Sequence, residues 1–366
     1  MDRNDTIKIV LGSVSAFLLL LLLFVIFGCC CCRRRRRRRL WRKTEELMEM
    51  GKKRCDYMEE LEAEDLMCFQ GGEDLTVHDI LDAPGEVVGK SGYGTLYMAS
   101  LERRDSVVLL RFLRPACMER MVEIVPAIRM VGFVRHPNLV PLQAFYSGPK
   151  GEKLLVHPFY FGGNLSQFLR DASDESHRWP VVYKISLGIA EGLDCLHTGL
   201  QKPIIHGNLK SKNILLDSNR QPYLSDFGLH LLLNPTVGQE VLEASADEGY
   251  KAPELIKMKD ASKESDVYSL GVILLEMLTR KEPIYRSSSS PLDLYLPTSM
   301  RNAALDHKVI EMFNFELLSQ SNRQTSITEE GLLMYFQLAM SCCSPSPSLR
   351  PDTKQIIRKL KEIGQQ

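Results

Sequence analysis

Several features that commonly indicate a function are missing from this chain of 366 residues. No Cys-x-x-Cys pair recurs with the spacing of zinc ligands, so the ten cysteines do not predict a structural zinc site. No internal repeat is present, which excludes a repeat architecture. The chain also lacks a net charge, because 46 Lys and Arg balance 46 Asp and Glu.

The neutral total conceals an uneven distribution of charge. Residues 1–43 hold 11 Lys and Arg against 2 Asp and Glu, whereas the remaining residues hold 35 against 44. The basic part adjoins a long apolar segment, so its charge is expected to face a membrane surface. Nucleic acid is therefore not an expected partner.

The apolar segment is a candidate membrane span. Ile9 to Gly28 contain no charged side chain and are long enough to cross a bilayer as a helix. A cleaved signal peptide is the alternative, but no small-x-small cleavage site follows. Arg33–Arg39 follow instead, and the positive-inside rule keeps them cytoplasmic. We predict a single-pass plasma-membrane protein with its N-terminus outside, divided into a short extracellular tail (1–8), a transmembrane helix (9–28), a Cys/Arg cluster (29–43) and a linker (44–73).

The Cys/Arg cluster has two further expected roles. Cysteines at a membrane boundary are candidates for S-acylation, although they can equally be small apolar residues at a helix end; they are Cys29, Cys30, Cys31 and Cys32. Arg33–Arg39 exceed what a stop-transfer signal requires, and each arginine gains about 1 kcal/mol beside anionic lipid. We therefore predict binding to anionic lipids. The other cysteines are expected to be reduced and buried.

The rest of the chain has an α+β pattern. Ser106–Leu113 and Lys153–His157 have the composition of strands. From Val182 onward, apolar residues recur at helical spacing, as they do again between Leu270 and Leu278. We predict one two-lobed domain over residues 74–363, β-rich to about residue 158 and helical after it.

Ordered motifs within this domain resemble those of protein kinases. His206-Gly207-Asn208-Leu209-Lys210-Ser211-Lys212-Asn213 is similar to the catalytic loop His-Arg-Asp-Leu-x-x-x-Asn. Asp226-Phe227-Gly228 and Ala252-Pro253-Glu254 follow it in the order of that family. Segments 74–90, 135–142 and 341–352 resemble plant receptor-like kinases of the leucine-rich-repeat branch, without the repeats. The resemblance implies a two-lobed kinase-like fold preceded by a single transmembrane helix.

Three positions to which the resemblance assigns catalytic groups carry other residues. Asn208 stands at the position of the proton-accepting Asp, and a carboxamide cannot accept a proton near neutral pH. Arg111 stands at the phosphate-binding lysine position, or Leu110 after a one-residue slip, and no lysine occurs between Lys90 and Lys150. Ala127 falls at the αC glutamate position, and Pro126 is expected to disturb that helix.

Other positions keep the residues that the family uses. The implied nucleotide site is a weak one, and it consists of Gly89, Gly92, Gly94, Arg111, Lys210, Asn213 and Asp226. Within it Asn213 and Asp226 would hold magnesium, but both residues can equally be retained because they organise their loops. Glu254 and Arg350 resemble the buried ion pair of the family, and Asp266 resembles the anchor of the catalytic loop. These last three are expected to be structural.

We therefore predict a membrane-anchored receptor-like pseudokinase that acts as a signalling scaffold or allosteric partner without phosphotransfer. The expected partners are an active receptor-like kinase or another signalling protein, and anionic membrane lipids. No cofactor is required, and ATP with magnesium would bind weakly. One alternative is a weak or atypical Ser/Thr protein kinase in which Lys90 or Arg111 compensates. Another is a nucleotide-gated switch that transfers no phosphate.

Overall fold

The computed structural model describes residues 66–171, 178–256, 260–286, 293–313, 317 and 327–365. They belong to one compact unit that spans residues 65–366. The predicted transmembrane helix, Cys/Arg cluster and most of the linker lie outside the described residues. None of the helices in the described ranges is long and apolar enough to cross a bilayer.

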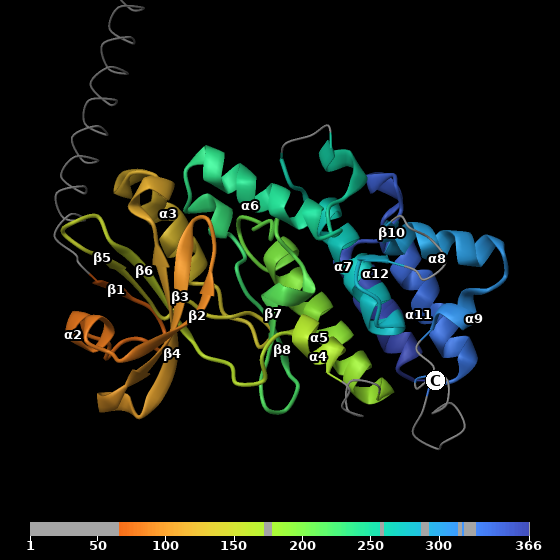
Figure 1. Ribbon diagram of the computed structural model, residues 1–366, viewed down its shortest axis with the longest axis horizontal. Helices are drawn as coiled ribbons and strands as arrows, with labels where there is room; N and C mark the ends of the chain where they lie inside the picture. Colours follow the sequence, from red (N-terminus) through yellow and green to blue (C-terminus); the bar gives the residue numbers. More distant parts are fainter. Residues whose placement is uncertain are drawn as a thin grey trace, which may run out of the picture. The chain divides into compact units, whose positions relative to one another are not determined.

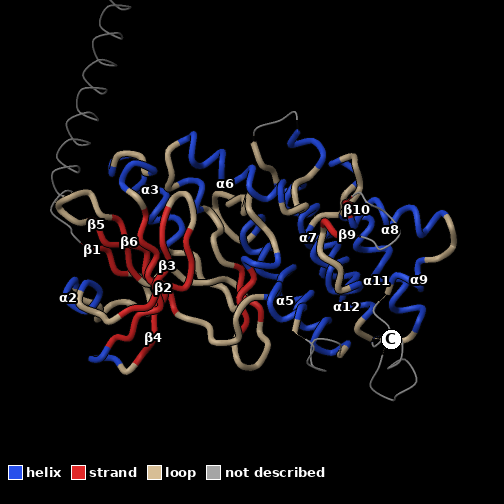
Figure 2. The backbone as a smooth tube through the Cα atoms, viewed as in Figure 1, coloured by secondary structure: helices blue, strands red, loops and turns tan. Residues whose placement is uncertain are grey.

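The first lobe is built on a six-stranded antiparallel sheet (Figures 1 and 2). Its strands are β1 (Leu66–Cys68), β2 (Gly85–Lys90), β3 (Gly94–Leu101), β4 (Ser106–Leu113), β5 (Ala144–Ser147) and β6 (Lys153–Pro158), in the spatial order β1-β5-β6-β4-β3-β2. The strands predicted at 106–113 and 153–157 are confirmed. β1 lies in the segment that the sequence assigned to the linker, so the sheet begins earlier than residue 74.

Strand β4 has two different faces. Val108 and Leu110 pack into an apolar core on the outer face of the sheet, beneath helix α2 (Val77–Leu81). Side chains alternate along a strand, so Leu109 and Arg111 point to the opposite face, where both line the cleft between the lobes. Arg111, rather than Leu110, therefore faces the cleft.

Helix α3 (Met121–Gly132) runs through Pro126, although the sequence led us to expect a disturbed helix there. Proline lacks an N–H, so the helix loses one backbone hydrogen bond at this position. Pro126 is exposed, and water can satisfy the carbonyl that is left over. The neighbours Ile124, Val125 and Ile128 are buried, and their packing holds the helix together.

The second lobe is helical. Its helices are α4 (Leu165–Arg170), α5 (Trp179–Thr198), α6 (Pro235–Asp247), α7 (Lys263–Thr279), α8 (Leu296–Leu305), α9 (Val309–Met312), α11 (Glu329–Cys342) and α12 (Thr353–Ile363). The two predicted helical stretches are confirmed as parts of α5 and α7. Residues 265–279 of α7 are all buried, which makes this helix the centre of the lobe. Helix α11 packs on α7, and α12 packs on α5.

Short elements complete the chain. Two hairpins pair β7 (Ile214–Leu216) with β8 (Pro222–Leu224), and β9 (Ile284–Arg286) with β10 (Asp293–Tyr295). The 3-10 helices are η1 (Glu102–Arg104), η2 (Pro115–Cys117), η4 (Ser211–Asn213), η5 (Leu229–Leu231), η6 (Pro253–Ile256) and η8 (Pro347–Leu349). The β7–β8 hairpin connects residues 206–213 to residues 226–228.

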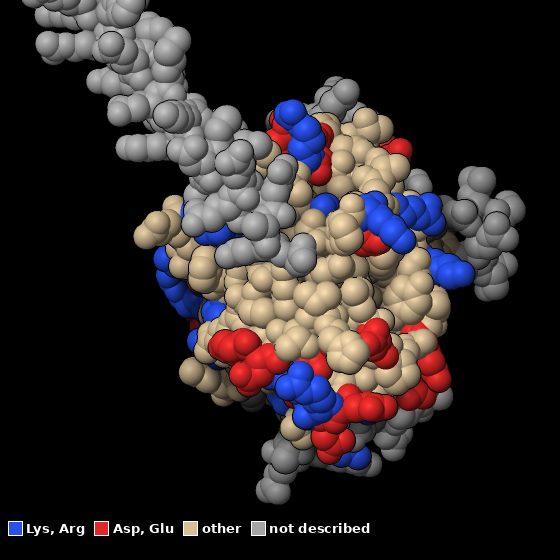
Figure 3. Space-filling model, turned by 90° about the vertical axis from the view of Figure 1, so that its left-hand side faces the viewer, with Lys and Arg blue, Asp and Glu red and all other residues tan. Residues whose placement is uncertain are grey.

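The burial of the cysteines and the distribution of charge on one face complete the description. Cys342 and Cys343 are buried as expected, whereas Cys117 and Cys195 are only partly buried. Cys68 is exposed, because it lies on the edge strand β1. Figure 3 views the β-rich lobe from its outer end. Asp and Glu side chains gather along the lower margin of that face, and uncharged side chains make up much of its middle.

Candidate functional site

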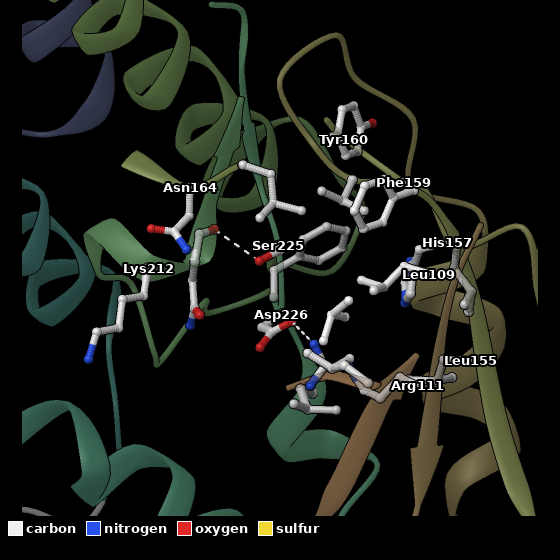
Figure 4. A pocket seen from close by; sticks show the side chains of 18 of the residues that line it. Leu109, Arg111, Leu155, His157, Phe159, Tyr160, Asn164, Lys212, Ser225 and Asp226 are labelled. Carbon is white, nitrogen blue, oxygen red and sulfur yellow. Dashed lines mark hydrogen bonds and ion pairs between the residues drawn. The ribbon is translucent and has the colours of Figure 1, made fainter. Parts of the chain in front are cut away.

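A cavity of about 410 Å³ lies in the cleft between the sheet and the helical lobe (Figure 4). Its walls are mostly apolar and include Val88, Leu96, Leu109, Leu155 and Leu215. Three consecutive aromatic residues, 159–161, follow β6 and line the same cavity. A cavity of this size and composition is typical of a small-molecule site.

Arg111 and Asp226 form an ion pair at one end of this cavity. The guanidinium comes from β4 and the carboxylate from the loop after β8, and Figure 4 shows the two side chains pointing toward each other. Only 7% of the Arg111 side chain and 11% of the Asp226 side chain are exposed. Burial alone would lower the pKa of Arg111, but the adjacent carboxylate raises it above its ordinary value. Arg111 therefore keeps its charge in this buried position because the Asp226 carboxylate lies next to it.

Tyr93 adds a third side chain to this end. The Tyr93 hydroxyl accepts a hydrogen bond of 3.3 Å from Arg111 Nη1, and the Arg111 guanidinium carbon lies 5.9 Å from the ring centroid. Burial raises the pKa of Tyr93, and the Asp226 charge acts in the same direction. The tyrosine is therefore neutral at physiological pH.

Residues 89–94 contain three glycines and form a glycine-rich loop, which closes on itself. The Ser91 N–H donates to the Gly94 carbonyl at 2.9 Å, and the Ser91 hydroxyl reaches the same oxygen at 3.2 Å. Gly89 lies in β2 and Gly94 opens β3, with exposed Gly92 between them. These residues therefore form the turn of a hairpin that joins β2 to β3, with the Tyr93 side chain directed toward Arg111.

Helix α3 supplies no acidic partner to Arg111 among the described ion pairs. Ala127, at the position where the resemblance places a glutamate, is half-buried. Glu123 lies one turn earlier and pairs with Arg120 at the surface. The carboxylate that Arg111 meets comes from Asp226 instead.

Asp266 anchors the loop that contains residues 206–213. Its carboxylate accepts the backbone N–H groups of His206 and Gly207, both at 2.8 Å. His197 Nε2 contacts the same carboxylate at 2.9 Å. Asp266 is buried, so these contacts satisfy a charge that would otherwise be costly in the core.

Asn208 lies in this anchored loop and is itself buried. Its side-chain oxygen is enclosed and has no hydrogen-bond partner among the described residues. Asn213 donates from its side-chain nitrogen to the Asn208 backbone carbonyl at 2.8 Å, which ties the two ends of the loop together. The loop geometry is thus maintained around an amide that cannot act as a base.

Two lysines of the loop are held by one glutamate. Lys210 Nζ lies 2.7 Å from Glu248 Oε1, and Lys212 Nζ lies 2.8 Å from Glu248 Oε2. Glu248 directly follows helix α6. Lys90 is exposed at the end of β2 and is not among the residues that line the cavity.

Glu254 and Arg350 form a bidentate ion pair, and neither residue lines the cavity. Their two nitrogen–oxygen distances are 2.6 and 2.7 Å, and Arg350 also donates to the Glu264 carbonyl at 2.8 Å. Burial would raise the pKa of Glu254, but hydrogen bonding to Arg350 lowers it. The pair joins η6 to the segment before α12 and so stabilises the packing of the helical lobe.

The sequence did not indicate several residues of the site, among them Leu109, Tyr93, His157 and Glu248. The period of two along β4 could have revealed Leu109, because it precedes Arg111 by two residues. His157 is the last residue of a predicted strand, so the sequence could have indicated it as a candidate residue of the site. No local pattern marks the inward turn of Tyr93 or the pairing of Glu248.

The two lobes, the cleft between them and the anchored loop together define a domain of the protein-kinase type. Residues 83–360 match the family of protein tyrosine and serine/threonine kinases. The chain belongs to this family, in its plant receptor-like branch.

Two relatives from Arabidopsis thaliana are each 40% identical over 299 residues, which is 81% of this chain. One is the putative kinase-like protein TMKL1, of which 44% is covered, and the other is the probable leucine-rich repeat receptor-like protein kinase IMK3, of which 37% is covered. The chain thus spans less than half the length of these relatives. Several further Arabidopsis relatives are named as inactive receptor kinases.

Two solved structures are similar over most of the chain. The kinase domain of maize SIRK1 bound to AMP-PNP has a TM-score of 0.71 and 29% identity, covering 82% of this chain and 99% of that one. The pseudokinase domain of BIR2, an immune regulator of the RLK/Pelle family, has a TM-score of 0.66 and 26% identity, covering 84% and 93%. The fold is therefore shared by a nucleotide-bound kinase and by a pseudokinase.

Proposed function

We propose that this protein is a receptor-like pseudokinase, which acts by binding a signalling partner at the plasma membrane and transfers no phosphate. The observation that carries the proposal is the buried Arg111–Asp226 ion pair. Among protein kinases these two positions contact the nucleotide phosphates and magnesium. In this chain they contact each other.

The energy of this contact supports the proposal. Breaking a buried ion pair by removing one partner from the other costs about 3–5 kcal/mol. Magnesium and the phosphates of a nucleotide would have to replace the contact between Arg111 and Asp226 with contacts of their own, so the loss of this pair reduces their net affinity. Asn208, at the position of the base, would in addition leave the attacking hydroxyl without a proton acceptor.

The donor set fits magnesium poorly as well. A magnesium ion that binds phosphates is held by one or two carboxylates. Among the described residues that line the cavity, Asp226 supplies the one carboxylate, and it is already paired with Arg111. Asn213 donates from its side-chain nitrogen to the Asn208 carbonyl, so its side-chain oxygen is left as the second candidate ligand. Lys90, which could compensate in a weak kinase, is exposed and does not line the cavity.

A phosphotransfer assay tests the proposal. The full-length protein in detergent micelles would be incubated with labelled ATP, magnesium and a generic protein substrate. We expect the wild-type protein to incorporate no more label into the substrate than the Asp226→Ala variant does. Incorporation by the wild type that Asp226→Ala abolishes, while the variant still shows a cooperative melting transition, would overturn the proposal.

The membrane part of the proposal rests on the sequence and on the relatives, which are receptor-like kinases. Residues 9–28 span the membrane once with the N-terminus outside, Arg33–Arg39 bind anionic lipids, and Cys29–Cys32 are acylated. The partner is an active receptor-like kinase or another signalling protein. Recovery of the full-length protein in the soluble fraction after cell lysis would contradict this part of the proposal.

A further inference from the structure

A second hollow, of about 440 Å³, is a groove on the surface of the helical lobe between α11 and α12. Met334 and Leu338 line it from α11, and Ile363 lines it from α12, so much of its wall is apolar. None of its lining residues belongs to the cavity between the lobes. The groove is therefore a separate candidate site for binding a partner.

The charge of this groove is positive. Of the described residues that line it, Arg358 and Lys359 are cationic and none is acidic. Lys359 is paired with Glu362 at 2.7 Å on the same helix. Arg358 is exposed and has no ion-pair or hydrogen-bond partner among the described residues. An apolar wall beside such a cation favours a segment that carries both carboxylates and apolar side chains.

The chain itself contains a segment of that composition. Its densest run of carboxylates is residues 59–65, where five of seven positions are Asp or Glu. Met58 precedes the run and Leu61 lies within it. A helix would place these two apolar side chains on one face, because they are three residues apart. The sequence of this segment, which lies outside the described residues, thus complements the groove in charge and in apolar character.

The place where this segment joins the domain favours a groove on another copy of the chain. The segment directly precedes β1, and Figure 1 shows β1 and α11 toward opposite ends of the domain. Fully extended, the chain from Met58 to Leu66 reaches at most about 29 Å. A domain of this size is on the order of 50 Å across. The segment is therefore better placed to reach a neighbouring copy than its own groove.

We propose that the groove between α11 and α12 binds the acidic segment 58–65 of a second copy of this chain. Arg358 and Lys359 contact carboxylates of the segment, and Met58 and Leu61 contact the apolar wall. Two copies that exchange their segments reciprocally form a closed dimer. Anchoring in one membrane raises their effective concentration. The inference takes from the proposed function only the membrane anchor, and it stands whether or not the protein transfers phosphate.

Site-specific photocrosslinking tests this inference on the full-length protein in vesicles of phosphatidylcholine and phosphatidylserine. One copy carries Gln337→p-benzoylphenylalanine, at an exposed position that lines the groove. It is mixed with an equal amount of isotopically labelled wild type. We expect mass spectrometry to identify a crosslink from the groove to the labelled segment 58–65. A crosslink to the unlabelled segment alone, or to lipid in place of the segment, would overturn the proposal.

Charge reversal in the groove tests the ionic contact. Arg358→Glu in the copy with the crosslinker should reduce the labelled crosslink at least about tenfold, because it places like charges together. Lys361→Glu is the matched control. Lys361 is exposed on α12, pairs with Glu191 and does not line the groove, so its reversal should leave the crosslink unchanged.

The reciprocal reversal is made in the labelled copy, as Glu59→Lys, Glu60→Lys and Glu62→Lys together. These positions precede the compact unit 65–366, so they test the same contact if Arg358→Glu does not fold. We expect this variant to lose the crosslink to the wild-type groove and to regain it with Arg358→Glu. Equal crosslinking in all four combinations would contradict the proposal.

The outcomes separate the two proposals. Absence of any crosslink to the labelled segment overturns this inference and leaves the proposed function standing. Phosphotransfer in the assay with labelled ATP overturns the proposed function and leaves this inference standing. Recovery of the full-length protein in the soluble fraction contradicts the membrane anchor on which both rely.

Discussion

The Arg111 guanidinium and the Asp226 carboxylate, 115 residues apart in the sequence, meet as a buried ion pair in the cleft. Tyr93 completes this arrangement from the glycine-rich loop. The pair closes the end of the cavity where a kinase would hold phosphates and metal. The protein thus keeps the kinase fold and uses these side chains to stabilise its own cleft.

The first prediction concerns the stability that this pair provides. Arg111→Met leaves Asp226 buried without a partner, and we expect it to lower the free energy of unfolding by about 3–5 kcal/mol. Arg120→Met is the matched control, since it breaks an exposed pair with Glu123 and should cost about 0–1 kcal/mol. Equilibrium denaturation of the three proteins measures both values, and equal effects of the two variants would contradict the prediction.

The second prediction concerns Glu248. Burial would raise its pKa, but Lys210 and Lys212 lower it below the ordinary value for glutamate. Its ion pairs therefore stabilise the fold above the ordinary pKa and are lost as the pH falls through the lowered one. Glu248→Gln removes them at all pH values. We expect faster amide hydrogen exchange in α6 of this variant at neutral pH and unchanged exchange in α11. Unchanged exchange in α6 would count against this role.

The third prediction concerns the buried carboxyl group of Glu276. Burial raises its pKa to about 8, and Tyr250 donates a hydrogen bond to it at 2.7 Å. Because the pKa of Glu276 in the folded state lies above the ordinary 4.5, the unfolded chain releases this proton at a lower pH than the folded protein does. Stability from this group is then full below pH 4.5 and declines as the pH rises to about 8.

Glu276→Gln tests this dependence, because the amide keeps a hydrogen-bond acceptor and does not titrate. We expect the difference in unfolding free energy between variant and wild type to change in favour of the variant as the pH rises across that interval. A difference that is independent of pH would show that Glu276 does not titrate in this way.

The fourth prediction concerns the docking of the first residues of the domain on α3. A Cβ atom added at Gly132 would lie 2.2 Å from the Phe69 ring, whereas one added at Gly92 would meet nothing within 4 Å. Gly132→Ala should therefore destabilise the domain by about 1–3 kcal/mol, as overpacked sites do. Gly92→Ala is the matched control and should change stability by less than about 0.5 kcal/mol. Thermal melting that shows no difference between them would refute the close contact.

Much of the fold could be predicted, because it rests on local patterns. The alternating and branched residues of 106–113 specify β4, and the apolar period of α5 and α7 specifies two central helices. The three-residue strand β1 could not be predicted, since its pairing with β5 depends on partners far along the chain. Pro126 misled the prediction because tertiary packing of α3 outweighs the loss of one hydrogen bond.

The candidate site could be predicted less completely. The absence of lysine between residues 90 and 150 reveals that the phosphate-binding lysine of the family is missing from β4. It does not reveal that Arg111 meets Asp226, because that contact depends on how the two lobes face each other. The inward position of Tyr93 and the pairing of Glu248 likewise depend on loop conformation, which residue type does not fix.

The most direct test of the central claim is a titration of the full-length protein with manganese in place of magnesium, followed by electron paramagnetic resonance in the presence of ATP. If Arg111 occupies the Asp226 carboxylate, the spectrum should show no protein-bound manganese beyond that seen with Asp226→Asn. A saturable single manganese site that Asp226→Asn removes would contradict the account.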